Sequence, residues 1–290
     1  MRVRTVLAFA AIFIVWGSTY LAIRYAVAEI PPLLTAGLRH LTAGALLLGW
    51  ARFKGLRASA IEWRHSAVVG ALFFLIGHGT LHWAEQFVPS GLSALMVATE
   101  PVWIAMLLAM TGRSGLNART VVGLFIGLVG VWILVGGGSM SSGGPGLLAG
   151  CLAVLVGAAS WAGGVVYSQK APLPVNPLLR TATTLICGAA MLLIAAAVFG
   201  EFGRLTMPSV RAVSSLAYLI VFGSIIAFSA YYWLLDRFPA TVVATHTYVN
   251  PAVAVLLGWA MGGERVSASL VVGLIVITSA IALVSSAAER

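Results

Sequence analysis

Long runs of residues nearly free of charge recur from one end of this chain to the other. Each is close to the roughly 20 apolar residues that a helix needs to cross a bilayer. Of the 290 residues, 60% are hydrophobic and 9% are charged, whereas a soluble domain carries about 25% charged residues. The sequence therefore predicts an all-α integral membrane protein with ten transmembrane helices. We expect them near residues 5–25, 33–51, 66–86, 90–111, 118–137, 147–169, 176–199, 211–234, 240–261 and 267–287.

The basic residues gather on one side of the predicted membrane. With the N-terminus in the cytoplasm, eleven Lys and Arg residues fall on the cytoplasmic side and three on the opposite side. This asymmetry is the positive-inside bias, and it explains the net charge of +9 without a nucleic-acid partner. Ten helices then place both termini in the cytoplasm. The first run has no small-residue cleavage site after it, so we interpret it as a helix and not as a signal peptide.

The two halves of the chain resemble each other. Shifting the sequence by 150 residues gives eleven identities in the 42 positions from 83 to 124, including VVGL at 121–124 and 271–274. Such self-similarity indicates a duplication, with a first repeat at 1–138 and a second at 145–287. Five helices in each repeat make the second enter the membrane in the opposite sense. Two inverted five-helix repeats are typical of secondary transporters, whose substrate sites lie near the bilayer midplane.

Several segments carry a family resemblance. They are WGSTYLAIR (16–24), PPLLTAGLRH (31–40), AEQFVPSGLSALMVATEPVW (84–103), FGSIIAFSAYYWLL (222–235), YVNPAVAVLLG (248–258) and GGE (262–264). In this order the chain resembles the EamA branch of the drug/metabolite transporter superfamily. The resemblance implies ten helices in a cell (inner) membrane and export of small metabolites, amino acids or drug-like compounds. The family often has a glutamate after the fourth helix too, where this chain has Ser114.

Three aromatic residues lie near the middle of predicted helices. Trp16 and Trp161 occupy corresponding places in the first helix of each repeat, and Tyr20 follows Trp16 by one turn. An interfacial anchoring role does not explain tryptophans at this depth. We expect them to form aromatic walls of a central cavity, and the alternative is packing between helices.

A carboxylate lies in the middle of the fourth predicted helix. Glu100 precedes Pro101, which frees a backbone carbonyl one turn back and loosens the helix. Because a charged residue at this depth is costly and usually functional, we expect a cavity role, as a proton carrier or cation partner. The alternative is a buried hydrogen bond. The corresponding pair in the second repeat is Asn250 and Pro251, with His246 one turn away on the same face.

Basic residues inside two predicted helices have two interpretations. Arg39, with its neighbour His40, lies about a third of the way into the second helix, and Arg180 lies near the start of the corresponding seventh helix. We expect their side chains to extend toward the membrane interface, and the alternative is a functional role inside the membrane. Arg24 and Glu85 lie at the outer ends of their helices, where a pair between them would close the outer mouth.

A histidine face raises the question of a metal site. His78, His82 and Glu85 recur at helical spacing, which is compatible with a metal ligand set. However, the residue after His78 is Gly79, so the HExxH signature of zinc hydrolases is absent. The second repeat has aromatic residues at the two matched positions, Phe228 and Tyr232. We therefore expect the two histidines to contact substrate, and Glu85 to belong to the outer gate.

The sequence predicts a secondary transporter that exports small organic solutes across the plasma membrane by alternating access. A channel-like facilitator on the same fold is one alternative, and an intramembrane metalloenzyme using His78 and His82 is a weaker one. No cofactor or metal is expected; the expected partners are a small-molecule substrate, the lipid bilayer and protons as a coupling ion, in a monomer or homodimer. The expected substrate-binding residues are Trp16, Tyr20, His78, His82, Glu100, Trp161, His246 and Asn250, and the expected gating residues are Arg24, Glu85, Pro101 and Pro251.

Overall fold

The computed structural model describes residues 2–111, 118–136, 146–238, 243 and 246–288. Within these residues all regular structure is helical, and there is no strand. The helices are α1 (Arg2–Ala10), η1 (Ala11–Val15), α2 (Trp16–Val27), α3 (Pro32–Phe53), α4 (Ala60–Gly70), η2 (Ala71–His78), α5 (Gly79–Ala84), α6 (Ser90–Val97), α7 (Glu100–Met110), α8 (Ala118–Gly136), α10 (Leu147–Ser168), α11 (Pro177–Val198), η3 (Glu201–Arg204), α12 (Val210–Tyr218), η4 (Leu219–Ile226), α13 (Ala227–Leu235), α15 (His246–Ala260) and α16 (Ala268–Ala288).

Six helical stretches of the described residues are long and apolar enough to cross a membrane. They are Val3–Val27, Ala60–Ala84, Ser90–Met110, Leu147–Ser168, Pro177–Val198 and Val210–Leu235. Val249–Ala260 and Ala268–Ala280 are shorter apolar helices. The chain is thus an all-helical protein of the integral membrane class, while ten membrane crossings in an inverted repeat remain a prediction.

One predicted boundary was misplaced for a local reason. The third helical stretch begins at Ala60, earlier than the expected position 66. Its first turn is polar, so hydropathy alone did not find it. Ser59 Oγ accepts a hydrogen bond from the Glu62 backbone N–H, and the Glu62 carboxylate accepts one from the Ser59 backbone N–H in return. This reciprocal capping box satisfies two N–H groups that a helix start leaves unpaired.

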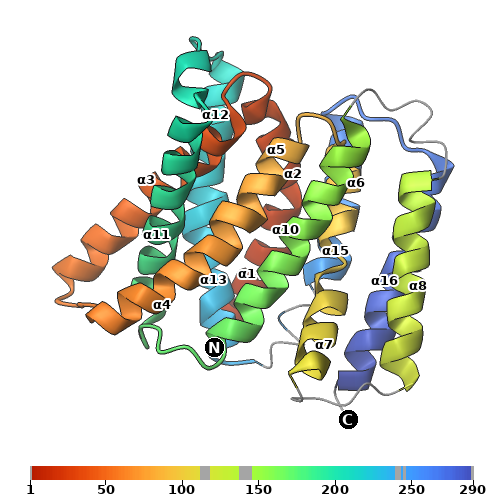
Figure 1. Cartoon of the computed structure of the whole chain (residues 1–290), viewed down its shortest axis with the longest axis horizontal. Coiled ribbons are helices and arrows are strands. Elements are labelled where there is room, and N and C mark those ends of the chain that lie inside the picture. Colours follow the sequence, from red (N-terminus) through yellow and green to blue (C-terminus); the bar gives the residue numbers. More distant parts are fainter. Residues whose placement is uncertain (1, 112–117, 137–145, 239–242, 244–245, 289–290) are drawn as a thin grey trace.

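The helices form a bundle with a pair at each side (Figure 1). The α3 helix packs along α11 at one side, and α8 packs along α16 at the other. Between them, α10 contacts η2, α5 and α7, and α15 contacts α2 and α6. The α1 helix begins and α16 ends at the same end of the molecule, the lower end of Figure 1. The central helices therefore come from both halves of the sequence.

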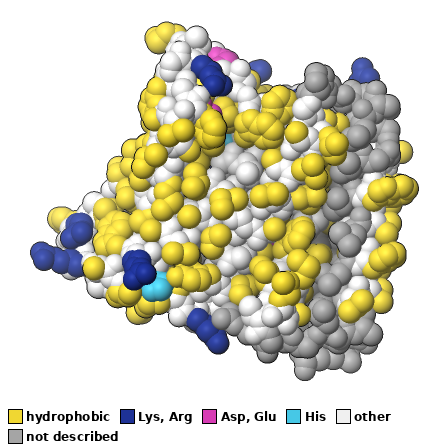
Figure 2. All heavy atoms as spheres, viewed as in Figure 1, with side chains coloured by type: hydrophobic (Ala, Val, Ile, Leu, Met, Phe, Trp, Pro, Cys, Tyr) yellow, Lys and Arg dark blue, Asp and Glu magenta, His cyan; other side chains and the backbone are white. Residues whose placement is uncertain are grey.

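The surface has the distribution of side chains expected for a bilayer. In Figure 2, basic side chains lie toward the two ends of the visible face, and hydrophobic side chains cover the part between them. Large apolar residues are exposed along the helices, including Leu46, Ile194 and Phe222. Lipid tails can cover such residues without the penalty that water would impose.

Small residues allow the helices to approach closely. A Cβ atom added to Gly188 of α11 would lie 2.5 Å from Phe74 Cβ and 2.8 Å from the Gly70 carbonyl oxygen. The glycine at 188 therefore sets the contact between α11 and the α4–η2 helix. This use of glycine at helix interfaces is common in membranes, where the hydrophobic effect does not drive helices together.

Among the described residues, three helical stretches contain a π-helical segment, namely η1, η2 and η4. The wider turn shifts backbone hydrogen bonds and leaves carbonyl groups for side chains to bind. The Gly223 carbonyl accepts a hydrogen bond from Trp16 Nε1 at 3.2 Å, and the Leu72 carbonyl accepts one from Ser160 Oγ at 2.8 Å. These segments thus tie helices of the two halves together beside the cavity described next.

Candidate functional site: a central cavity

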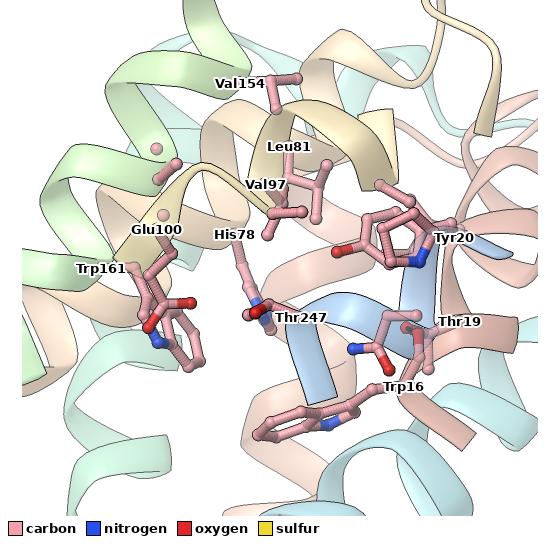
Figure 3. A pocket seen from close by; sticks show the side chains of 18 of the residues that line it. Trp16, Thr19, Tyr20, His78, Leu81, Val97, Glu100, Val154, Trp161 and Thr247 are labelled. Carbon is pink, nitrogen blue, oxygen red and sulfur yellow. Dashed lines mark hydrogen bonds between the residues drawn. The ribbon is translucent and has the colours of Figure 1, made fainter. Parts of the chain in front are cut away.

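A cavity of about 730 Å³, its opening included, lies between the central helices. Its wall contains eight of the twelve residues that the sequence analysis selected: Trp16, Tyr20, His78, Glu100, Trp161, His246, Asn250 and Pro251. Figure 3 shows side chains from both halves of the chain around one space, with Glu100 beside Trp161 and with Tyr20 and Thr19 across from them. The structure therefore brings together residues that are up to 235 positions apart. Arg24, His82, Glu85 and Pro101 do not line it.

The aromatic residues of the wall contact one another. The Trp16 and Trp161 rings meet edge to face, with their centroids 6.3 Å apart. The Trp161 ring also stacks on His78, with centroids 5.4 Å apart and an angle of 19° between the planes. Trp16 meets Phe228 edge to face at 5.1 Å. The two tryptophans thus combine the two roles that the sequence suggested, because they pack between helices and also present ring surface to the cavity.

Glu100 lies where the fourth helical stretch is interrupted. The α6 helix ends at Val97 and α7 begins at Glu100, immediately before Pro101. The side chain is 5% exposed, and the structure gives it no hydrogen bond or ion pair to another described residue. Its position in the first turn of α7 lets the partial positive charge of a helix N-terminus stabilise a carboxylate. The structure does not show the buried hydrogen bond that was the alternative for Glu100. It shows a carboxyl group that lines the cavity.

In the second half, Asn250 has a partly structural role. With its amide oriented to satisfy its neighbours, the side-chain nitrogen donates hydrogen bonds to the carbonyls of Ile12, Phe13 and His246, at 3.0, 2.9 and 3.1 Å. Two of these carbonyls belong to the π-helical segment η1. The amide oxygen of Asn250 is left for other partners, so its proposed substrate contact is restricted to accepting a hydrogen bond.

The histidines at 78 and 82 have different surroundings. His78 lines the cavity, and its Nδ1 lies 2.8 Å from Nε2 of His40 on α3. His82 is fully buried outside the cavity, and its Nδ1 lies 2.7 Å from the His78 carbonyl oxygen. Because a carbonyl can only accept, this nitrogen carries the proton, and Nε2 of His82 has no partner among the described residues. We predicted that His82 contacts the substrate, but in this structure its side chain lies outside the cavity.

Arg39 corrects one of our expectations. We predicted that its side chain extends to the membrane interface, but it is 1% exposed and lines the cavity. Its Nε donates a hydrogen bond to Ser224 Oγ at 2.8 Å, and its Nη1 has no partner among the described residues. The position of Arg39, a third of the way into an apolar run, could have indicated a functional residue inside the membrane. The rule that long basic side chains reach outward led us to discount it.

Arg180, the basic residue on the corresponding helix, does extend to the end of its helix. It donates hydrogen bonds to the carbonyls of Pro174 and Val175, both at 3.0 Å. It also forms an ion pair with Asp236 at 3.2 Å. The two arginines thus differ in depth although their helices correspond.

The expected pair between Arg24 and Glu85 is replaced by another. Arg24 Nη1 lies 2.6 Å from Oε1 of Glu264, the glutamate of the GGE segment. The same carboxylate accepts hydrogen bonds from the backbone N–H groups of Ser90 and Gly91 at the start of α6. Both oxygens of Glu85, by contrast, are buried without a hydrogen-bond partner among the described residues. Glu264 therefore connects the ends of α2, α6 and α15. Its counterpart position, Ser114, lies outside the described residues.

The histidine face does not assemble a metal ligand set. No group of three or more His, Cys, Asp or Glu side chains able to hold a metal ion occurs in the described part of the chain. His78 and His82 both direct Nδ1 to protein partners, as described above. The metalloenzyme alternative thus receives no structural support.

Comparison with known proteins agrees with this architecture. The sequence model of the EamA-like transporter family matches twice, over residues 3–136 and 148–286. The chain belongs to the EamA-like transporter family. The family name indicates a transporter, and transporters are usually not enzymes.

Named relatives extend over almost the whole of this EamA-like protein. The chain is 38% identical over 294 residues to the "Uncharacterized inner membrane transporter YedA" of Escherichia coli (strain K12), which covers 98% of this chain and 93% of the relative. It is 27% identical over 282 residues to the "Uncharacterized transporter YoaV" of Bacillus subtilis (strain 168), covering 95% and 94%. A solved crystal structure with 22% identity superimposes with a TM-score of 0.70 over 100% of both chains, which shows a shared fold.

Proposed function

We propose that this EamA-like protein is a secondary transporter that exports small organic solutes across the inner membrane by alternating access. The observation that carries the proposal is the cavity, whose wall combines aromatic surfaces, hydrogen-bonding groups and ionisable side chains from both halves of the chain. A relative that is named an inner membrane transporter supports the location.

Matching contacts in the two halves support two interconvertible shapes. The α2 helix, in the first helical stretch, contacts the eighth and ninth stretches through α12 and α15. Its counterpart α10 contacts the third and fourth stretches, which match them in the first half, through η2 and α7. Ser59 and Ser209 both cap the helix that follows, and each Oγ accepts a hydrogen bond from the backbone N–H three residues on. In an inverted repeat, exchanging the arrangements of the two halves converts an outward-open shape into an inward-open one.

The Arg24–Glu264 pair and its contacts to α6 are the best candidate for the outer gate. Tyr20 and Ile23 line the cavity one turn or less before Arg24 on α2. Tyr25 of α2 also donates a hydrogen bond to the Met261 carbonyl at 2.5 Å. Separating α15 from α2 and α6 would break all these contacts and open a path from the cavity. We propose that this end is extracytoplasmic, since both termini belong to the other, more basic end.

A counterflow screen tests transport directly. Purified protein in liposomes loaded with unlabelled amino acids, small metabolites or cationic drugs should accumulate the labelled form of its own substrate and of few others. Protein-free liposomes and liposomes with an Arg24→Ala, Glu264→Ala variant are the controls. Absence of counterflow for every compound, with a monodisperse and folded protein, would reject the proposed function.

Coupling to protons separates a secondary transporter from a facilitator. Liposomes with an imposed pH gradient should accumulate substrate above its external concentration if protons drive transport. Equilibration without accumulation in either gradient direction would identify a facilitator on the same fold. The carboxyl group of Glu100, which lines the cavity, favours the coupled mechanism, because a cavity carboxyl group can alternate between its charged and neutral forms.

A further inference from the structure

The guanidinium of Arg39 is a buried cation without a counter-ion in this structure. The ion pairs of the described residues are Arg24–Glu264 and Arg180–Asp236, and neither includes it. Its side chain is 1% exposed, and Nη1 has no hydrogen-bond partner among the described residues. A buried, unpaired charge is strongly unfavourable, and buried charges in proteins are normally paired.

The protein holds this guanidinium in a fixed place. Arg39 Nε donates to Ser224 Oγ at 2.8 Å, which orients the plane of the group. A Cβ atom at position 223 would lie 2.8 Å from Arg39 Nη2, so Gly223 leaves room for the guanidinium in this position. Both residues belong to the π-helical segment η4 of the second half. The arrangement therefore positions the two outer nitrogens rather than neutralising them.

A chain of hydrogen bonds gives a second donor to the same cavity. Ser224 Oγ accepts from Arg39 and lies 3.4 Å from Nδ1 of His40, to which its own proton can be donated. His40 then carries its ring proton on Nε2 and donates to Nδ1 of His78 at 2.8 Å. The proton of a neutral His78 is consequently on Nε2, for which the structure shows no hydrogen bond to another described residue.

We propose that Arg39, with His78 as a second donor, binds the carboxylate of an organic acid in the central cavity. Arginine presents paired N–H groups that match the two oxygens of a carboxylate. The rings of Trp16 and Trp161 supply a neighbouring surface for an apolar or aromatic body. This inference rests on the proposed function for the site, and it adds that the transported solute carries a carboxylate.

Benzoate and benzamide form a matched pair for a test, since they share the ring and differ in charge. Binding to the full-length protein in lipid nanodiscs is measured by calorimetry, with empty nanodiscs as the blank. Benzoate should bind about tenfold or more tightly than benzamide, a difference of roughly 1.4 kcal/mol. Arg39→Gln should remove this preference by weakening benzoate binding alone. Arg180→Gln, which alters the arginine outside the cavity, should leave it unchanged.

Two further variants keep the test valid if Arg39→Gln fails to fold. Ser224→Ala removes the anchor of Nε, and Gly223→Ala crowds Nη2, while both retain the charge. Each should reduce the ratio of benzoate to benzamide affinity severalfold. An unchanged ratio in all folded variants, or equal affinity of the two probes in the unaltered protein, overturns the proposal.

The source of the anion is tested with chloride. Sodium chloride is added at the same concentration as benzoate. If it displaces benzoate, and if Arg39→Gln abolishes both benzoate binding and its displacement by chloride, the site holds a small inorganic ion and the proposal is rejected. Weak competition by chloride supports a carboxylate site. Loss of counterflow with an intact benzoate preference would reject transport but not the anion site. Counterflow of neutral solutes alone, without a preference for benzoate over benzamide, would support transport and reject the anion site.

Discussion

Glu264 Oε1 and Arg24 Nη1 lie 2.6 Å apart although 240 residues separate them in the sequence. The carboxylate also accepts the backbone N–H of Ser90 at 2.9 Å and that of Gly91 at 3.3 Å. It thereby caps the N-terminus of α6, where a negative charge is favourable. One acidic side chain thus connects the first helical stretch, the fourth and the ninth.

We expect Glu264→Gln to weaken this connection. The neutral amide loses the ion pair and accepts with one oxygen where the carboxylate used two, which should lower stability by about 1.5–3 kcal/mol, the usual value for hydrogen bonds to a charged group. The melting temperature in one detergent measures the change. Glu62→Gln, at an exposed helix start, is the control and should have a smaller effect. Equal melting temperatures for Glu264→Gln and the unaltered protein would contradict the assigned role.

A second prediction concerns the cavity carboxyl group. Glu100→Gln should abolish proton-driven accumulation of substrate in liposomes, because glutamine cannot carry a proton across the cycle. Counterflow exchange, which needs no net proton movement, should persist. The measurements are accumulation under an imposed pH gradient and the pH dependence of the initial rate. Unchanged accumulation together with an unchanged pH profile would rule out Glu100 as the proton carrier.

A third prediction tests helix packing. Gly188→Ala places a methyl group 2.5 Å from Phe74 Cβ and should destabilise the protein by about 1–3 kcal/mol through overpacking. The matched control is Gly163→Ala in α10, where an added Cβ meets nothing within 4 Å. That change should be neutral or stabilising by roughly 0.5–1 kcal/mol, because alanine favours a helix interior. The melting temperatures of the two variants measure these changes. Similar melting temperatures for Gly188→Ala and Gly163→Ala would refute the packing argument.

A fourth prediction concerns pH at a connection outside the membrane-spanning helices. The carboxylate of Glu29 accepts hydrogen bonds from the hydroxyl and the backbone N–H of Ser209, both at 2.6 Å, and they lower its pKa. A lowered pKa means that the stabilisation is present above the ordinary value of about 4.3 and is lost as the pH falls through the folded-state value.

The melting temperature of Glu29→Gln should therefore lie below that of the unaltered protein by a constant amount between about pH 6 and 8. The difference should shrink in acid, as the glutamate itself becomes neutral. Ser209→Ala, which lacks the donating hydroxyl, should show a weaker version of the same trend. A gap that widens on acidification would have the wrong sign for this contact.

The helical class could be read from the sequence because bilayer thickness fixes the length of an apolar run. Every predicted run coincides with a helix to within a few residues, apart from the polar start at Ser59 and the beginning of the ninth run, which lies outside the described residues. The interruptions within these helices were harder to predict from the sequence. Pro101 predicted a loosening at Glu100, but nothing in the residue pattern indicated the three π-helical segments, which depend on partners in distant helices.

The cavity wall could be predicted where depth in the bilayer was the argument, as for Trp16, Trp161 and Glu100. Pairing was harder, because the choice between Glu85 and Glu264 as the partner of Arg24 depends on how helices 60 and 240 residues away are placed. The depth of Arg39 was misjudged for a related reason. A basic side chain reaches outward unless a neighbour holds it, and that neighbour, Ser224, is in the other half of the chain.

The interruption between α6 and α7 has a mechanical consequence. Pro101 has no N–H, and α6 ends at Val97, so the two segments are not continuous across the residues between them. We therefore expect this stretch to bend at the break between Val97 and Glu100. The segment that Glu264 caps would then be able to tilt while the segment that begins at Glu100 keeps its direction, so that the change in angle falls at the depth of the cavity.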